Sequence, residues 1–151
     1  MKKTFPVAVI ALLVLLAGAQ LVRPARTNPP ANAPLPIDDP AAEAVFRRAC
    51  FDCHSNQTRW PWYAGVAPFS WLVVRDVNEG RSKMNFSTWK DPEGELPEEI
   101  CEEVRKGAMP LKIYLSLHPE ARLTQADKEA LCGWAGRAAP ASATAEDDED
   151  D

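Results

Sequence analysis

The hydrophobic pattern of the chain is helical, because apolar residues recur three and four positions apart and no run alternates as a strand would. Asp39 and Pro40 form an N-cap and first-turn pair, which predicts that a first helix begins there and ends near Cys50. Its apolar stripe consists of Ala42, Val45, Phe46 and Ala49.

Three longer helices are expected further along the chain. Their apolar stripes are Phe69, Leu72, Val73 and Val77, then Ile100 and Val104, and finally Ala126, Leu131 and Trp134. Gly80 is expected to stop the first and Gly107 the second, while Thr124 and Asp127 form a capping box before the third. Residues 85–94 are predicted to be a loop and residues 113–117 a short helical turn. The predicted fold is all-α.

The N-terminus carries an export signal. Lys2 and Lys3 precede an uncharged apolar run, Phe5–Val22, which is nearly the roughly 20 residues of a bilayer span. Residues 1–23 are therefore predicted to be a transmembrane signal anchor that places the rest of the chain on the periplasmic side of the bacterial cytoplasmic membrane. The alternative is cleavage near Ala17-Gly18-Ala19, which would release a soluble periplasmic protein.

Composition divides the remainder into three parts. Residues 24–39 are rich in proline and are expected to form a stiff linker, residues 40–138 the folded domain, and residues 139–151 a disordered acidic tail. The net charge of −5 arises from that tail, because removing the six acids of residues 146–151 leaves +1. A domain without a basic cluster excludes nucleic acid as a partner.

The strongest chemical signal is Cys50-Phe51-Asp52-Cys53-His54, which has the Cys-x-x-Cys-His spacing that attaches c-type haem. Two thiols about one helical turn apart reach the two vinyl groups of one porphyrin, and the adjacent His54 becomes the proximal iron ligand. The predicted cofactor is one covalent haem c. A thioredoxin-like dithiol would need a βαβ context, and a structural zinc site would need further paired ligands.

The sixth iron ligand is left with several candidates. Met109 is favoured because its thioether lies on a proline-braced loop beyond a helix, while His118 and then Met84 are alternatives. An open position would permit ligand chemistry instead. The remaining cysteines, Cys101 and Cys132, are expected either to form a disulfide between two helices or to remain buried thiols.

Aromatic residues are concentrated just after the haem motif. Trp60, Trp62 and Tyr63 are expected to be walls of the haem pocket or core, and Trp60, Tyr63 and Arg59 are candidate hydrogen-bond donors to the haem propionates. Plain packing is the simpler role for each of them taken singly.

Two resemblances accompany these motifs. The pairing of Ala42 and Phe46 with Leu131 and Trp134 resembles the crossing of first and last helices in small class I cytochromes c. More narrowly, the chain resembles the bacterial haem-binding domain family. The matching stretches are Gln20-Leu21-Val22-Arg23-Pro24, Cys53-His54-Ser55-Asn56, Thr58-Arg59-Trp60-Pro61-Trp62-Tyr63, Ser70-Trp71-Leu72-Val73, Glu79-Gly80-Arg81, and Met109-Pro110 through Tyr114 to His118-Pro119.

This resemblance implies a covalent haem in an all-α cytochrome-like fold outside the cytoplasmic membrane. The expected function is electron transfer to or from an unidentified redox partner protein, without enzymatic turnover. A haem-based ligand sensor or a peroxidase-like module is the alternative, and it requires an open or displaceable sixth iron position.

Overall fold

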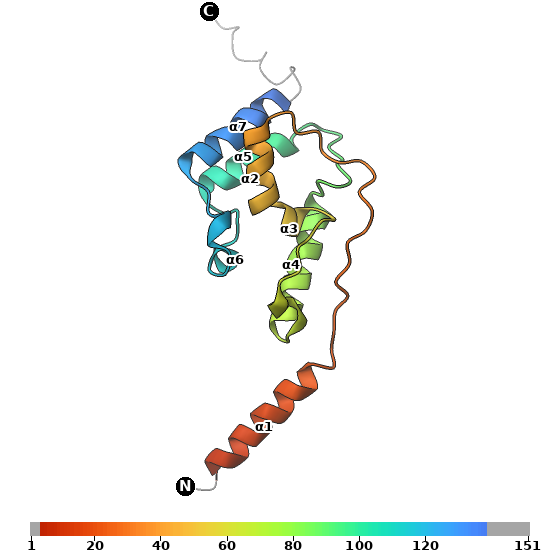
Figure 1. The fold of residues 1–151 in the computed structure, drawn as a ribbon, viewed down its shortest axis with the longest axis vertical. Coiled ribbons are helices and arrows are strands. Elements are labelled where there is room, and N and C mark those ends of the chain that lie inside the picture. Colours follow the sequence, from red (N-terminus) through yellow and green to blue (C-terminus); the bar gives the residue numbers. More distant parts are fainter. Residues whose placement is uncertain (1–3, 139–151) are drawn as a thin grey trace, which may run out of the picture.

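The computed structural model describes residues 4–138, and over them the chain is helical with a single isolated β-bridge between Ala33 and Thr88 (Figure 1). The predicted tail at residues 139–151 lies outside the described residues. The helices are α1 (Thr4–Ala19), α2 (Pro40–Ala49), α3 (Phe51–His54), α4 (Phe69–Lys83), α5 (Leu96–Lys106), α6 (Lys112–Leu115) and α7 (Gln125–Ala138), with the 3₁₀ turns η1 (Trp62–Gly65) and η2 (Pro119–Ala121).

Helices α2, α5 and α7 pack into one core. The Asp39 carboxylate caps α2 by accepting hydrogen bonds from the backbone N–H groups of Ala41 and Ala42, as predicted. Across the junction of α2 and α7, the rings of Phe46 and Trp134 meet edge to face with centroids 5.0 Å apart. The predicted crossing of the first and last domain helices is therefore confirmed.

A disulfide joins α5 to α7. Cys101 and Cys132 are bonded in the structure, with their Cα atoms 4.8 Å apart. Of the two states expected from the sequence, the structure contains the bridged one. The bridge closes the core on the side away from α2, so three helices are held together by ring packing and one covalent link.

Two predicted helix faces are corrected by the structure. Helix α4 buries Ser70, Val74 and Val77, while Phe69 and Leu72 of the expected stripe are exposed. Gly80 does not stop this helix, which continues to Lys83, because the glycine serves a close contact with the haem motif that is described below. In α7, Leu131 and Trp134 are buried as predicted, but Ala126 is exposed.

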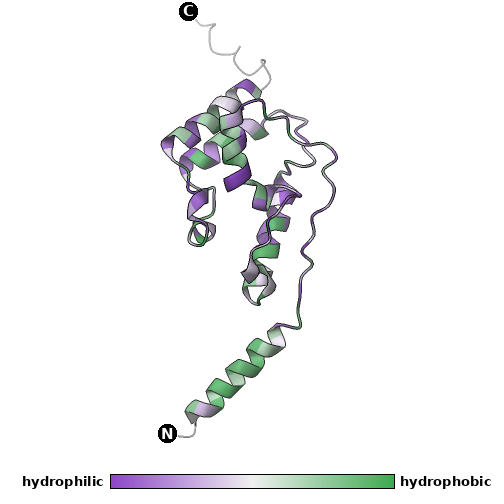
Figure 2. Ribbon diagram, in the orientation of Figure 1, coloured by the Kyte–Doolittle hydropathy of each residue, from purple (hydrophilic) through white to green (hydrophobic). Residues whose placement is uncertain are grey.

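Helix α1 extends away from the domain and is apolar on every side (Figures 1 and 2). None of the helices described over residues 4–138 combines the length and apolar character needed to cross a membrane. The expected transmembrane helix over Phe5–Val22 is thus not present. The helix ends at Ala19, and the following Gln20 side chain bonds to Leu16 O and to the backbone of Ala67 in the domain.

The proline-rich segment is extended but is attached to the domain. The Ala33 and Leu35 N–H groups donate to Ser87 O and Phe86 O, and the Trp89 N–H donates to Ala33 O. These bonds, together with those of Asn28, hold the segment against the domain surface. The Pro-rich linker at residues 24–39 therefore runs as a strap along the domain.

Candidate functional site

The haem motif occupies the junction of α2 and α3. Helix α2 ends at Ala49, and the N–H of its C-cap Cys50 still donates to Phe46 O. The next turn is closed by the bond from His54 N–H to Cys50 O at 2.9 Å. One continuous turn therefore carries Cys50, Cys53 and His54. All three side chains line the same cavity.

This cavity has a volume of about 400 Å³, within the range of small-molecule and cofactor sites. It is bounded by α3 and α4 on one side and by α5 and the segment before α6 on the other (Figure 1). Its apolar walls are Ala49, Met84, Phe86, Ile100, Val104, Met109, Pro110 and Leu111. Lys83 and the acids Asp76, Glu79, Glu99 and Glu103 also line it.

The His54 ring is oriented by the backbone. Its Nδ1 lies 3.3 Å from Met84 O, and burial lowers the pKa of the imidazole, which favours the neutral ring. Donation from Nδ1 to a carbonyl leaves Nε2 unprotonated, as a metal-ligating histidine requires. The histidine of the motif therefore has the tautomer and orientation of an iron ligand.

The two motif thiols differ from redox cysteines. Neither is bridged, and burial raises the pKa of Cys50 to about 12 and that of Cys53 to about 11. A catalytic dithiol needs a lowered pKa, so this pair does not resemble one. Over residues 4–138 there is also no cluster of three or more metal-ligating side chains that would suit zinc.

Glycine is required where α4 crosses the motif. A Cβ on Gly80 would lie 2.7 Å from the backbone oxygen of Cys53, a distance that real side chains do not tolerate. The missing side chain lets α4 pack directly on the turn that carries both thiols. Cys53 and His54 are therefore held against one wall of the cavity.

The structure separates the candidates for the sixth ligand. Met109 and Met84 both line the cavity, whereas His118 does not. The His118 ring instead bonds through Nε2 to the Tyr63 hydroxyl at 2.7 Å and through Nδ1 to Glu120 at 3.0 Å, and it stacks on Tyr114. Met84 is adjacent to His54, because its carbonyl oxygen lies 3.3 Å from the His54 Nδ1, whereas Met109 lies on a separate wall.

The aromatic residues after the motif lie elsewhere than expected. Trp60, Trp62, Tyr63 and Arg59 do not line the cavity, and Trp62 is 83% exposed. The aromatic side chains that do line it are Phe86 and Tyr114. Arg59 pairs instead with Asp52 of the motif. The cationic side chain on the cavity wall is that of Lys83.

Arg81 is a positioning residue that sequence reasoning did not single out. Its guanidinium donates to Ser55 O at 2.8 Å, to the Thr58 hydroxyl at 2.8 Å and to Thr27 O at 2.9 Å. It therefore ties α4 to the segment after the motif and to the N-terminal strap. In the sequence, Arg81 was indicated only as part of Glu79-Gly80-Arg81, one of the stretches that resemble the haem-binding domain family.

These observations fit a haem. The cavity offers two unbridged thiols, a neutral imidazole with its Nδ1 already bonded, and a thioether on a different wall, surrounded by apolar side chains. This donor set matches the thioether attachment and axial ligation of a c-type haem.

The comparisons with known proteins agree with this fit. A family model described as the haem-binding domain matches residues 14–137, which is well over half of the chain. No curated protein and no solved structure matches the chain. The match covers α2 to α7 almost completely, and the chain therefore belongs to the haem-binding domain family.

Proposed function

We propose that this protein is a single-haem c-type electron carrier in which Cys50 and Cys53 hold the haem covalently. His54 is the proximal iron ligand and Met109 the distal one. The observation that carries the proposal is that all four side chains line one cavity of about 400 Å³, while His118 lies outside it.

When bound, the haem supplies an iron that alternates between ferrous and ferric states. The chain contributes orientation and environment. The Met84 carbonyl fixes the His54 ring, and Gly80 lets α4 close on the motif. The apolar walls lower the local dielectric, and a thioether ligand raises the reduction potential relative to a second imidazole.

Transfer of electrons is favoured over catalysis by the composition of the walls. His54 is the only histidine among the residues that line the cavity, and its role there is ligation. A peroxidase-like mechanism would require an open sixth iron position, and in this proposal Met109 closes it. The proposed partner is therefore another redox protein rather than a substrate that is transformed.

The proposed location is the periplasmic side of the bacterial cytoplasmic membrane. Two observations support it: the apolar N-terminal segment that follows Lys2 and Lys3, and the disulfide between α5 and α7, since disulfides persist in oxidising compartments. In this proposal the N-terminal segment is retained in lipid and keeps the domain at the membrane.

The proposal is tested on the full chain matured with haem. After denaturation, haem absorbance should remain with the polypeptide, and Cys50 and Cys53 should resist alkylation. Met109→Ala should remove the charge-transfer band of sulfur ligation from the ferric spectrum and give a high-spin ferric iron. After reduction, the ferrous iron of this variant should bind carbon monoxide. His118→Gln is the matched control and should leave both spectra unchanged.

Two results would contradict the proposal. If the haem separates from the denatured chain, covalent attachment is wrong. If the parent protein is already high-spin and binds carbon monoxide, or if Met109→Ala changes nothing, the sixth position is not closed by Met109. Ligand sensing would then replace electron transfer as the function to pursue.

A further inference from the structure

A second feature of the molecule lies at the end of the domain from which α1 leaves. Around η1 and the first turn of α4, large apolar side chains are exposed to solvent, among them Trp62 at 83% and Phe69 at 53%. We call this set the η1–α4 surface; it consists of Trp62, Val66, Phe69, Trp71 and Leu72. Exposed patches of this kind mark interaction sites on soluble domains.

Helix α1 is fixed to the same end of the domain. The Gln20 side chain forms two hydrogen bonds with the Ala67 backbone, accepting from its N–H at 3.0 Å and donating to its carbonyl at 3.2 Å. Close by, the Trp71 indole N–H donates to Val22 O at 2.9 Å. The apolar helix is therefore joined through Gln20 and Val22 to the segment that carries the η1–α4 surface.

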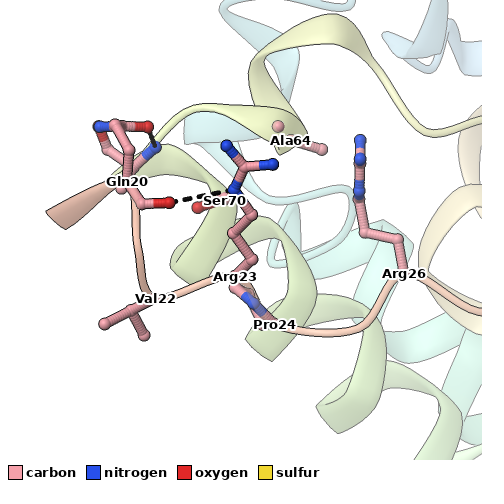
Figure 3. A pocket seen from close by; sticks show the side chains of 9 residues that line it. Gln20, Val22, Arg23, Pro24, Arg26, Ala64 and Ser70 are labelled. Carbon is pink, nitrogen blue, oxygen red and sulfur yellow. Dashed lines mark hydrogen bonds between the residues drawn. The ribbon is translucent and has the colours of Figure 1, made fainter. Parts of the chain in front are cut away.

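Two arginines border this junction. Arg23 and Arg26 follow the end of α1, and their side chains extend toward the loop that carries Ala64 (Figure 3). Arg23 donates to Gln20 O, and the Arg26 guanidinium lies beside Gly65. Within residues 4–138, neither arginine forms an ion pair with an acid.

We propose that the η1–α4 surface lies in the interfacial layer of a phospholipid bilayer, with Arg23 and Arg26 against lipid phosphates. Tryptophan is enriched at this depth of membranes because its ring is apolar and its N–H is polar. Arginines beside an apolar region complement the phosphate layer above the hydrocarbon. The inference rests on the proposed residence of the chain at a membrane.

The length of α1 supports the same arrangement. Its 16 residues give a helix of about 24 Å, shorter than the roughly 30 Å hydrocarbon core. An apolar helix of this length does not reach across a bilayer by itself. When α1 is inserted, the end of the domain that is bonded to it is drawn into the interface, where its exposed aromatic side chains are favourably placed.

Contact of the η1–α4 surface with the bilayer would also set the distance of the haem site from the membrane. Helix α4 runs from Phe69 in the η1–α4 surface to Gly80 at the haem motif, a distance of about 16 Å along the helix axis. Because α1 and α4 are joined by hydrogen bonds at Ala67 and Trp71, the domain would be held in one orientation rather than swinging on a linker. The haem would then face its redox partners at a constant distance from the membrane.

The experiment uses the full-length holoprotein in bilayers of phosphatidylcholine and phosphatidylglycerol. Nitroxide labels are placed by Trp62→Cys and Phe69→Cys, with Glu98→Cys on the exposed first turn of α5 as the matched control. With the iron reduced, power saturation measures how accessible each label is to oxygen and to a water-soluble nickel chelate. The labels at positions 62 and 69 should be several-fold more accessible to oxygen than to the nickel chelate. The label at position 98 should show the reverse.

A second comparison tests the arginines. With the label at position 69, Arg23→Gln combined with Arg26→Gln should shift accessibility toward the nickel chelate. Lys90→Gln combined with Arg105→Gln removes the same charge from exposed sites elsewhere and should change nothing. Equal effects of both pairs would overturn the assignment of lipid phosphates to Arg23 and Arg26.

Two outcomes would overturn the membrane surface itself. Labels at positions 62 and 69 that behave like the one at position 98 would show that the surface faces water. Spin–spin broadening that disappears on dilution with unlabelled protein would show that a second copy covers it. Mass spectrometry of each labelled sample distinguishes failure of this inference from failure of the proposed function. If thioethers do not hold the haem, Cys50 and Cys53 will take up label in all variants.

Discussion

Two parts of the domain are held together in different ways. Helix α7 contacts both α2 and α5, and the three helices share a core that includes Phe46, Leu131 and Trp134, all nearly inaccessible to solvent. Among the elements described over residues 4–138, α4 packs on α3 and η1, and its residues Asp76, Glu79, Gly80 and Lys83 line the cavity. The first part is complete as a protein core, whereas in the proposed function the second is completed by haem.

The α4 part depends on polar contacts that link it to the rest of the chain. Arg81 binds three backbone or hydroxyl oxygens, and the Asn85 side chain donates to Asn56 at 2.9 Å. Such bonds specify position but contribute only about 1 kcal/mol each to stability. The comparison teaches that the cavity lies between the two parts, so a haem bound in it should bridge them.

The largest effect is expected from removing the covalent attachment. In Cys50→Ala combined with Cys53→Ala, amide protection in α4 should fall about a thousandfold, because a tightly held ligand contributes on the order of 4 kcal/mol. Protection in α7 should fall much less. Hydrogen exchange read by mass spectrometry measures both helices in one sample, and an equal loss in α4 and α7 would contradict the division into two parts.

Truncation of the complete core should come next. Trp134→Ala removes the ring packed on Phe46 and should lower the free energy of unfolding by about 3–5 kcal/mol, measured by denaturant titration of the holoprotein. Trp62→Ala is the matched control, because its ring is exposed and its loss should change stability by less than about 0.5 kcal/mol in detergent solution. Similar losses from both would show that Trp134 is not part of the core.

Two glycine substitutions, with smaller expected effects on stability, test the same comparison between the two parts of the domain. Gly80→Ala would place a Cβ against the backbone oxygen of Cys53 and should destabilise by about 1–3 kcal/mol while reducing the yield of covalent haem. Gly136→Ala in α7 meets no atom within 4 Å and should stabilise by up to about 1 kcal/mol through helix propensity. Thermal unfolding and the ratio of haem to protein check both variants, and a tolerated Gly80→Ala would contradict the close contact.

The smallest expected effect depends on pH. Burial alone raises the pKa of Asp127, but hydrogen bonds from Arg48 and Thr124 outweigh it, so the net pKa is lowered. The stability that Asp127 contributes is therefore present above its unfolded pKa of about 3.9 and is lost as the pH falls through its folded value. Asp127→Asn should cost about 1 kcal/mol at pH 7, and the difference should shrink below about pH 4.

The control for this titration is an exposed pair. Glu43→Gln removes the surface partner of Arg47 on α2 and should cost less than about 0.5 kcal/mol at any pH. Denaturant titrations of both variants over pH 3–7 make the comparison. A difference for Asp127→Asn that does not change with pH would show that the capping carboxylate is not charged in the folded protein.

Local signals in the sequence predicted most of the helices and part of the site. The cap at Asp39, the left-handed Gly107 and the box of Thr124 with Asp127 each depend on neighbours within a few residues, and each is present. The face of α4 was predicted wrongly, because its burial is set by α3, η1 and the cavity rather than by its own apolar spacing. The positions of Trp60, Trp62 and Arg59 could not be predicted, since nearness in sequence to the motif does not specify side-chain direction.

The sequence by itself determined which thiols and which imidazole are the candidates to hold the haem, and that the fold is helical. These depend on residue types at short spacing, which helix geometry converts directly into a common face. Only the tertiary structure decided that Met109 rather than His118 lines the cavity, that Gly80 is a contact rather than a stop, and that the proline-rich segment is a strap. Those outcomes depend on contacts between residues distant in the chain, and the local pattern of hydrophobic and polar residues does not encode which distant backbone atom a side chain will meet.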